Sequence, residues 1–182
     1  MMGRYVIALS VVVVLVISGS AFSAIIETEP NDTMATADVI SSPTSYPWSD
    51  VGICSLDSSG SDIDYFKIWL NDADTVMTVV TTPLTVPFTS PDTLLGLFDS
   101  SGTLLVSNDD SGGTNGSTVM YDITTSDWYY IAVTGSGDTN FAGIDHGETG
   151  NYMLTVSVVP EPATLAMITL GGLLVLVRRR RH

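Results

Sequence analysis

Acidic and amide side chains gather in three groups, and their oxygen atoms are the type of ligand that a calcium ion takes. The groups are Glu27, Glu29, Asn31 and Asp32 along one extended segment, then Asp62 and Asp64 at the start of an apolar run, and then Asp99 with Asn108, Asp109 and Asp110 around one hairpin. Magnesium or a transition metal fits less well, because no His or Cys lies near these groups. The third group is a candidate second calcium site. The alternative for all three is a solvated acidic surface with Asx turns.

The charge balance of the chain favours cation binding over a solvated surface. Of 182 residues, 20 are acidic and six are basic. Between Ala24 and Val158 there are 19 acidic residues and a single basic one, Lys67, so nothing internal neutralises the carboxylates. The same imbalance excludes nucleic-acid binding by this region, which needs clustered Lys and Arg.

The elements that must position these groups are short strands. Apolar runs rich in Val, Thr, Ile, Tyr and Trp are broken by Gly, Asp, Asn, Ser and Pro, which is typical of strands and turns. The expected strands are Val51–Leu56, Tyr65–Leu70, Val76–Thr82, Thr93–Phe98, Leu104–Ser107, Thr118–Ile123, Trp128–Thr134 and Tyr152–Val158. About eight short strands with little helix predict an all-β sandwich or barrel. Asp32 or Thr33 is expected to cap one short helical turn.

One domain accounts for the middle of the chain. About 135 residues suffice for one hydrophobic core. Cys54 is the only cysteine, so a disulfide scaffold is excluded, and its side chain is expected to pack in its strand. Trp48, Trp69 and Trp128, together with the tyrosines, are candidates for a sugar-stacking platform, although burial is the expected fate of most of them.

The N-terminus has the three parts of a secretory signal peptide. Arg4 precedes an apolar run from Tyr5 to Ile17, and small residues follow. We therefore expect residues 1–23 to be a signal peptide and residues 24–158 to be the mature domain. A retained membrane anchor is the alternative, and it is disfavoured because a spanning helix needs about 20 apolar residues.

The C-terminus carries a second targeting signal. Val159-Pro160-Glu161-Pro162 is followed by 15 residues of apolar sequence and then by Arg178, Arg179, Arg180 and Arg181. This segment, residues 159–182, resembles the PEP-CTERM sorting signal of Gram-negative bacteria. The resemblance implies a hydrophobic helix that anchors the chain transiently in the inner membrane, with the arginines as a membrane stop in the cytoplasm and the domain outside it. It also implies an exosortase-type partner that cleaves near Pro-Glu-Pro, with transfer to the cell surface or an exopolysaccharide matrix. An ordinary tail anchor is the alternative.

The middle region resembles the bacterial pre-peptidase C-terminal domain. The resemblance rests on ordered blocks: Glu27–Thr33, Asp62–Phe66, Leu95–Gly102 with Ser107–Asp110, Trp128–Val133, and Gly150–Leu154. It implies a single jelly-roll-like β-sandwich of antiparallel strands that often binds calcium. The implied ligands are Glu27, Glu29, Asn31, Asp32 and one or both of Asp62 and Asp64. Two departures from the family pattern are Ser126-Asp127-Trp128-Tyr129 and the long loop 138–148.

No catalytic constellation emerges from the sequence. His146 is the only histidine outside the tail, and no nucleophile elbow accompanies it. We expect a non-enzymatic, calcium-stabilised binding or structural module of the cell surface or the exopolysaccharide matrix, with a polysaccharide or an extracellular protein as partner. The alternative is an accessory or inhibitor-like domain that acts on a separately encoded secreted protease.

Overall fold

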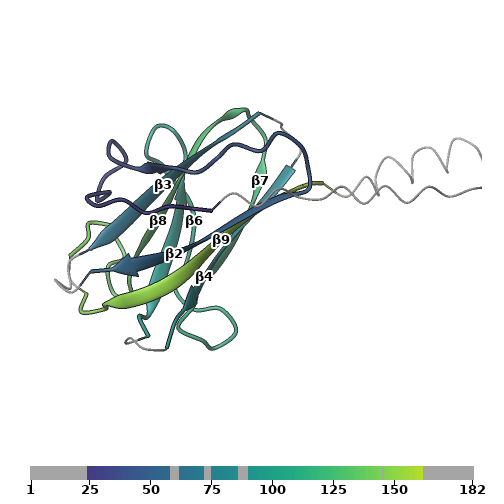
Figure 1. Ribbon diagram of the computed structural model, residues 1–182. Coiled ribbons are helices and arrows are strands. Elements are labelled where there is room, and N and C mark those ends of the chain that lie inside the picture. Colours follow the sequence, from purple (N-terminus) through teal and green to yellow (C-terminus); the bar gives the residue numbers. More distant parts are fainter. Residues whose placement is uncertain (1–23, 58–61, 72–74, 86–89, 145, 162–182) are drawn as a thin grey trace, which may run out of the picture.

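The computed structural model describes residues 24–57, 62–71, 75–85, 90–144 and 146–161 (Figure 1). These residues form nine strands: β1 (Asp38–Val39), β2 (Trp48–Leu56), β3 (Ile63–Leu70), β4 (Thr75–Pro83), β5 (Thr93–Phe98), β6 (Leu104–Asn108), β7 (Thr118–Ile123), β8 (Asp127–Gly135) and β9 (Gly150–Pro160). The expected signal peptide and most of the expected sorting signal lie outside the described residues. Within these residues, no helix has the length and apolar character that crossing a membrane requires.

The strands form two sheets that face each other as a sandwich. One sheet has the order β1-β3-β8-β5-β6 and the other has the order β2-β9-β4-β7. Figure 1 shows β2, β9 and β4 in one layer and β3 and β8 in the other. From β2 onward the chain alternates between the two sheets in the jelly-roll pattern, except that β5 and β6 form a hairpin within one sheet, and all neighbouring strands are antiparallel. The predicted all-β jelly-roll sandwich is confirmed.

All eight expected strands are present, and a ninth was missed. Strand β1 has only two residues, and it pairs in parallel with β3, with Asp38 opposite Phe66. A strand of two residues is too short to show an alternation of apolar and polar side chains in the sequence. The expected helical turn is a single hydrogen-bonded turn, in which the Thr36 N–H donates to the Thr33 carbonyl (3.0 Å), so Thr33 rather than Asp32 starts it.

The last strand runs further than expected. Strand β9 continues to Pro160, which lies opposite Thr75 of β4, so the expected boundary after Val158 falls inside the strand. The ladder ends there because proline has no N–H to donate.

Alternating side chains build two apolar clusters. The larger one fills the space between the sheets and includes Phe66, Ile131 and Leu154, each fully buried. Cys54 belongs to it and is 1% exposed, as expected from its place in β2. The smaller cluster lies on the outer side of the β3-β8-β5 layer, where Phe141 of the long loop covers it. Among the described residues, both clusters are built from the range 25–158, which supplies the apolar core of both sheets.

Candidate metal centre

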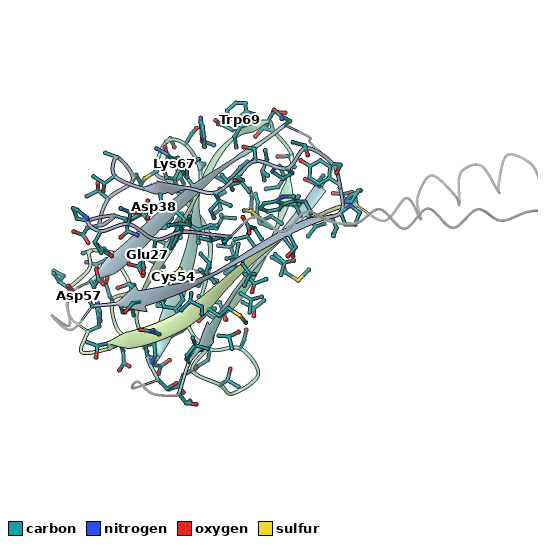
Figure 2. All side chains as sticks on the ribbon, in the orientation of Figure 1. Glu27, Asp38, Cys54, Asp57, Lys67 and Trp69 are labelled. Atoms are coloured by element: carbon teal, nitrogen blue, oxygen red, sulfur yellow. The ribbon has the colours of Figure 1, made fainter. Side chains whose placement is uncertain are left out.

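The first acidic group lies on residues 25–32, a segment that crosses one end of the sandwich and is called the strap. The Ile25 N–H donates to the Val51 carbonyl on β2 (3.0 Å). Six residues later, the Asn31 carbonyl accepts from the N–H of Tyr65 on β3 (3.0 Å). The strap thus joins the two sheets. Figure 2 shows Glu27, Asp38 and Asp57 at the same end of the sandwich.

Gly52 lets the strap lie close to β2. A Cβ at this position would lie 2.3 Å from the Ile25 carbonyl oxygen. We expect Gly52→Ala to push the strap off β2, to destabilise the sandwich by about 1–3 kcal/mol, and to weaken cation binding at the strap. Thermal melts of the sandwich check this. Gly147→Ala is the matched control, because a Cβ there meets nothing within 4 Å. Equal Tm values for the two variants would show that the strap does not depend on this close approach.

The fold brings the first two acidic groups together. Carboxylate oxygens of Glu27, Glu29 and Asp64 lie within 4.8 Å of one another, and so do those of Glu29, Asp32 and Asp62. Glu29 belongs to both sets, so five carboxylates form one continuous cluster. Asp62 and Asp64 reach it from the start of β3 and are buried, whereas Glu29 and Asp32 are exposed. Every residue of the first predicted site therefore lies at this end.

Three buried oxygens at the cluster have no hydrogen-bond partner among the described residues. They are Glu27 Oε1, Asn31 Oδ1 and Asp64 Oδ1. For both acids the second oxygen is held: the Ser55 N–H donates to Glu27 Oε2 (2.9 Å), and the Tyr152 hydroxyl donates to Asp64 Oδ2. Buried polar atoms in proteins are nearly always satisfied. One oxygen of each acid is thus fixed by the protein, and the other is left for a ligand that accepts lone pairs.

No positive charge among the described residues compensates the carboxylates of the cluster. Burial raises the pKa of Glu27 to about 7. Burial, and then the nearby charge of Glu27, raise the pKa of Asp64 well above its usual value. Burial also raises the pKa of Asp62 and of Glu29. A bound cation would remove this penalty by pairing with the charged forms.

The donor chemistry of the cluster is oxygen only. Cys54 lies near it and is not among the grouped ligand atoms, and burial raises the pKa of its thiol, which disfavours the thiolate that metals bind. Carboxylate and amide oxygens without thiolate or imidazole suit calcium better than zinc or copper. The residues present fit a calcium ion.

The four residues of the second predicted site do not come together. Asn108 ends β6 opposite Leu95, whereas Asp99 follows β5 at the other end of the same hairpin. The Asp99 carboxylate instead closes its own turn by accepting the N–H groups of Ser101 and Thr103 (both 2.9 Å). These residues are close in sequence because a single hairpin connects them. The paired length of β5 and β6 nevertheless keeps Asp99 at one end of the hairpin and Asn108 at the other.

Three residues that support the cluster were missed by the sequence analysis. Tyr152 is fully buried in β9 and reaches Asp64 across the sandwich. The Asp38 carboxylate accepts the Thr28 N–H (2.7 Å) and the Asn31 amide (3.4 Å), which holds the strap. The Asp57 N–H donates to the Asp62 carboxylate. Their contacts depend on the pairing of distant strands, so no local motif announces them.

His146 lies beside the cluster. Its Nε2 lies 2.9 Å from the Asp62 carbonyl oxygen, so the imidazole ties the long loop to the start of β3. The same loop is anchored by Asp138, which is fully buried and accepts the Gly143 N–H (2.8 Å) and the Thr134 hydroxyl (2.9 Å).

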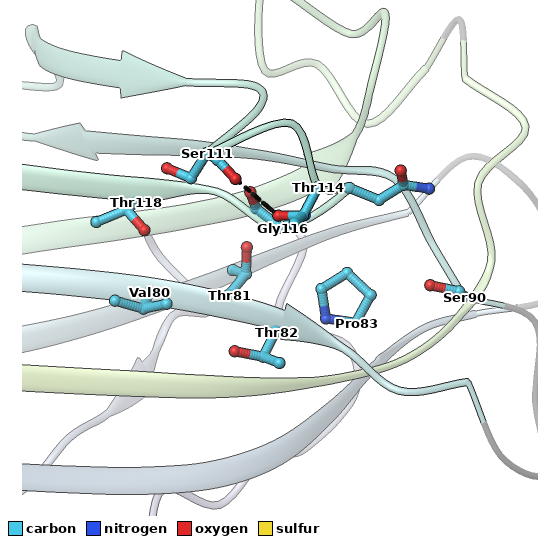
Figure 3. A pocket seen from close by; sticks show the side chains of 10 residues that line it. Val80, Thr81, Thr82, Pro83, Ser90, Ser111, Thr114, Gly116 and Thr118 are labelled. Carbon is cyan, nitrogen blue, oxygen red and sulfur yellow. Dashed lines mark hydrogen bonds between the residues drawn. The ribbon is translucent and has the colours of Figure 1, made fainter.

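A separate hollow opens where β4 ends (Figure 3). Figure 3 shows Thr82 and Pro83 on one side of it and Ser111, Thr114 and Gly116 of a loop on the other. The loop is closed by a hydrogen bond from the Thr114 hydroxyl to the Ser111 carbonyl (2.8 Å). The described residues that line the hollow carry no charge, so its chemistry differs from that of the acidic cluster.

Comparison with known proteins decides the nature of the C-terminus. Residues 158–181 match the PEP-CTERM protein-sorting motif. The chain carries a PEP-CTERM signal. This signal marks an exported protein that is anchored transiently in a membrane and handled by an exosortase-type enzyme. No curated protein matches the chain by sequence.

Solved structures similar to the PEP-CTERM protein are distant in sequence. A periplasmic inhibitor of g-type lysozyme from Aeromonas hydrophila, PliG, is 15% identical, with a TM-score of 0.47 over 67% of this chain and 95% of its own. The pre-peptidase C-terminal domain of a collagenase from Bacillus anthracis is 13% identical, with a TM-score of 0.40 over 67% and 93%. PliG from Salmonella Typhimurium is 12% identical, with a TM-score of 0.36 over 78% and 99%. Their activities belong to those proteins.

Proposed function

We propose that this protein is a non-enzymatic binding or structural module of the cell surface or the exopolysaccharide matrix, and that calcium stabilises its sandwich. The observation that carries the proposal is the PEP-CTERM motif, which starts at Val158 within the last strand. The sorting signal thus begins directly at the last strand of the sandwich.

Calcium is supported by the end of the sandwich that holds the strap. Glu27, Glu29, Asp62 and Asp64 would supply charged oxygens to the ion, and Asn31 would supply a neutral one. The unpartnered oxygens of Glu27, Asn31 and Asp64 are the specific reason for assigning an ion to this position. When bound, the ion would neutralise carboxylates that nothing else in the described residues neutralises. Its role is to fasten the strap to β2 and β3.

The non-enzymatic role is supported by how the reactive side chains are used. The Nε2 atom of His146 contacts a backbone carbonyl, not a serine hydroxyl. Cys54 is buried and its thiol has a raised pKa, so it lacks the thiolate that a nucleophile needs.

Fractionation of the producing bacterium tests the proposal. We expect the exported, epitope-tagged full-length protein to be recovered with the exopolysaccharide. In a strain that makes no exopolysaccharide, the same protein should appear free in the medium. If the protein is free in both strains and is purified together with a secreted protease, the accessory-domain alternative is correct and matrix association is wrong.

A further inference from the structure

Two tryptophans lie side by side on the outer face of the β1-β3-β8-β5-β6 sheet. Trp69 of β3 and Trp128 of β8 are directly opposite each other in the ladder. Their ring centroids are 5.6 Å apart, with the planes at 66°. Both side chains are half-buried, and neither belongs to or packs against the two apolar clusters. Trp48, by contrast, packs against the larger cluster. The indole pair is therefore not part of either apolar cluster.

Lys67 stands next to the indole pair. It is the only basic residue between Ala24 and Val158, in a region with 19 acidic residues. Even so, it forms no ion pair with an acidic side chain among the described residues. Its Nζ atom lies 5.9 Å from the centre of the Trp128 ring instead. Figure 2 shows Lys67 and Trp69 on the side of β3 that faces away from β2.

Lys67 also belongs to a row of neighbouring residues that crosses the whole width of the sheet. Val39, Lys67, Tyr130, Phe98 and Leu104 occupy neighbouring positions on β1, β3, β8, β5 and β6 in turn. The ends of this row are open, since Val39 is 64% exposed and Leu104 is 43% exposed. Four strand spacings of about 4.8 Å give a row of roughly 19 Å. Phe98 in the middle of the row is buried and packs against Phe141, so the row is accessible at its ends and at the half-buried Lys67 and Tyr130.

Asp127, the residue before Trp128, already has hydrogen-bond partners. Asp127 accepts the Trp128 N–H (2.7 Å) and the Ser100 hydroxyl (2.7 Å). Among the described residues, the patch formed by Trp69, Trp128 and Lys67 therefore offers two indoles and an ammonium group that contacts the Trp128 ring. A basic protein would be drawn to the acidic cluster instead, and a nucleic acid would be repelled by the net charge.

We propose that this patch binds a saccharide chain, with pyranose rings stacked on Trp69 and Trp128 and a sugar oxygen accepting from Lys67. The C–H face of a pyranose is apolar and packs on the electron-rich face of an indole. Hydroxyl or carboxylate oxygens at the ring edge accept hydrogen bonds from an ammonium group. This inference rests on the proposed matrix association and names the ligand class and the surface that would carry it.

Titration of the sandwich, residues 24–161, with defined oligosaccharides tests the site. The probes are cellohexaose and maltohexaose, which are neutral, and hexagalacturonate, which carries carboxylates. We expect at least one probe to bind, as measured by calorimetry and by a change in tryptophan fluorescence. Trp69→Ala and Trp128→Ala should each weaken binding by about tenfold. Trp48→Phe is the control and should leave binding unchanged. Lys67→Gln distinguishes the sugars: a larger loss for hexagalacturonate than for the neutral probes identifies a uronic acid at Lys67, and an equal loss identifies a hydroxyl.

Two results would overturn the site. One is that none of the three oligosaccharides binds to a sandwich whose Tm is normal. The other is that both tryptophan variants bind as well as the parent. Recovery of the Trp69→Ala/Trp128→Ala full-length protein with the exopolysaccharide would leave the matrix association intact and show that another surface mediates it. Oligosaccharide binding by a protein that stays free in the medium would support the site and show that the proposed matrix association is wrong.

Discussion

The Tm of the sandwich is expected to rise by roughly 5–10 °C between EDTA and millimolar calcium. An ion that binds only the folded state stabilises it by RT ln(1 + [L]/Kd), which is about 2.7 kcal/mol at a hundredfold excess over Kd. Without calcium, the carboxylates of the strap repel those of Asp62 and Asp64. A bound calcium ion attracts both sets of carboxylates, so that their repulsion no longer opposes folding. Differential scanning calorimetry of residues 24–161 measures the difference.

Substitution at the cluster separates calcium binding from general stability. Glu29→Gln removes a charge that both carboxylate sets share, from an exposed side chain, so the Tm in EDTA should change little while most of the calcium-dependent rise disappears. Asp64→Asn should abolish the rise as well, and it tests the buried oxygen that has no partner. Asp122→Asn is the matched control, because it removes an exposed charge from β7 of the other sheet. A parent sandwich with the same Tm in EDTA and in calcium would show that the cluster holds no ion.

Replacement of Pro160, Glu161 and Pro162 by alanine is expected to leave nearly all of the exported protein in the membrane fraction. The processing enzyme needs an accessible, extended segment, which the two prolines enforce. The structure adds a further reason, because Pro160 is where the ladder between β9 and β4 stops. Alanine restores the missing N–H and allows the strand to continue into the cleavage region. Immunoblots of membrane and released fractions measure the outcome.

The control for this experiment is the fold of the sandwich itself. Pro160→Ala in residues 24–161 should leave the Tm close to that of the parent, since the substitution lies at the exposed end of β9. Release of the triple variant at the normal rate would show that the Pro-Glu-Pro segment is not what the processing enzyme recognises.

Much of the candidate site could be predicted from local sequence, and the remainder could not. Glu27, Glu29, Asn31 and Asp32 were predicted as one group because they follow each other along a single segment. Their partners Asp62 and Asp64 come from another strand, and only the resemblance to a known domain linked the two groups in advance. Asp138 shows the opposite case: in sequence it is one more acid in a polar loop, but in the fold it is fully buried and organises that loop.

The sequence by itself determined eight of the nine described strands and the chemical types of the candidate ligands. Alternating apolar residues set the strands, because the side-chain period of a strand is local. The excess of acids over Lys67 required an external cation or a solvated surface, and the sorting motif is contiguous, so it is readable without a fold. The tertiary structure decided which acids meet. The jelly-roll crossings bring the strap onto β2 and β3, whereas the paired length of β5 and β6 keeps Asp99 away from Asn108. It also decided that Trp69 and Trp128 are neighbours, because the pairing of β3 with β8 sets them directly opposite each other.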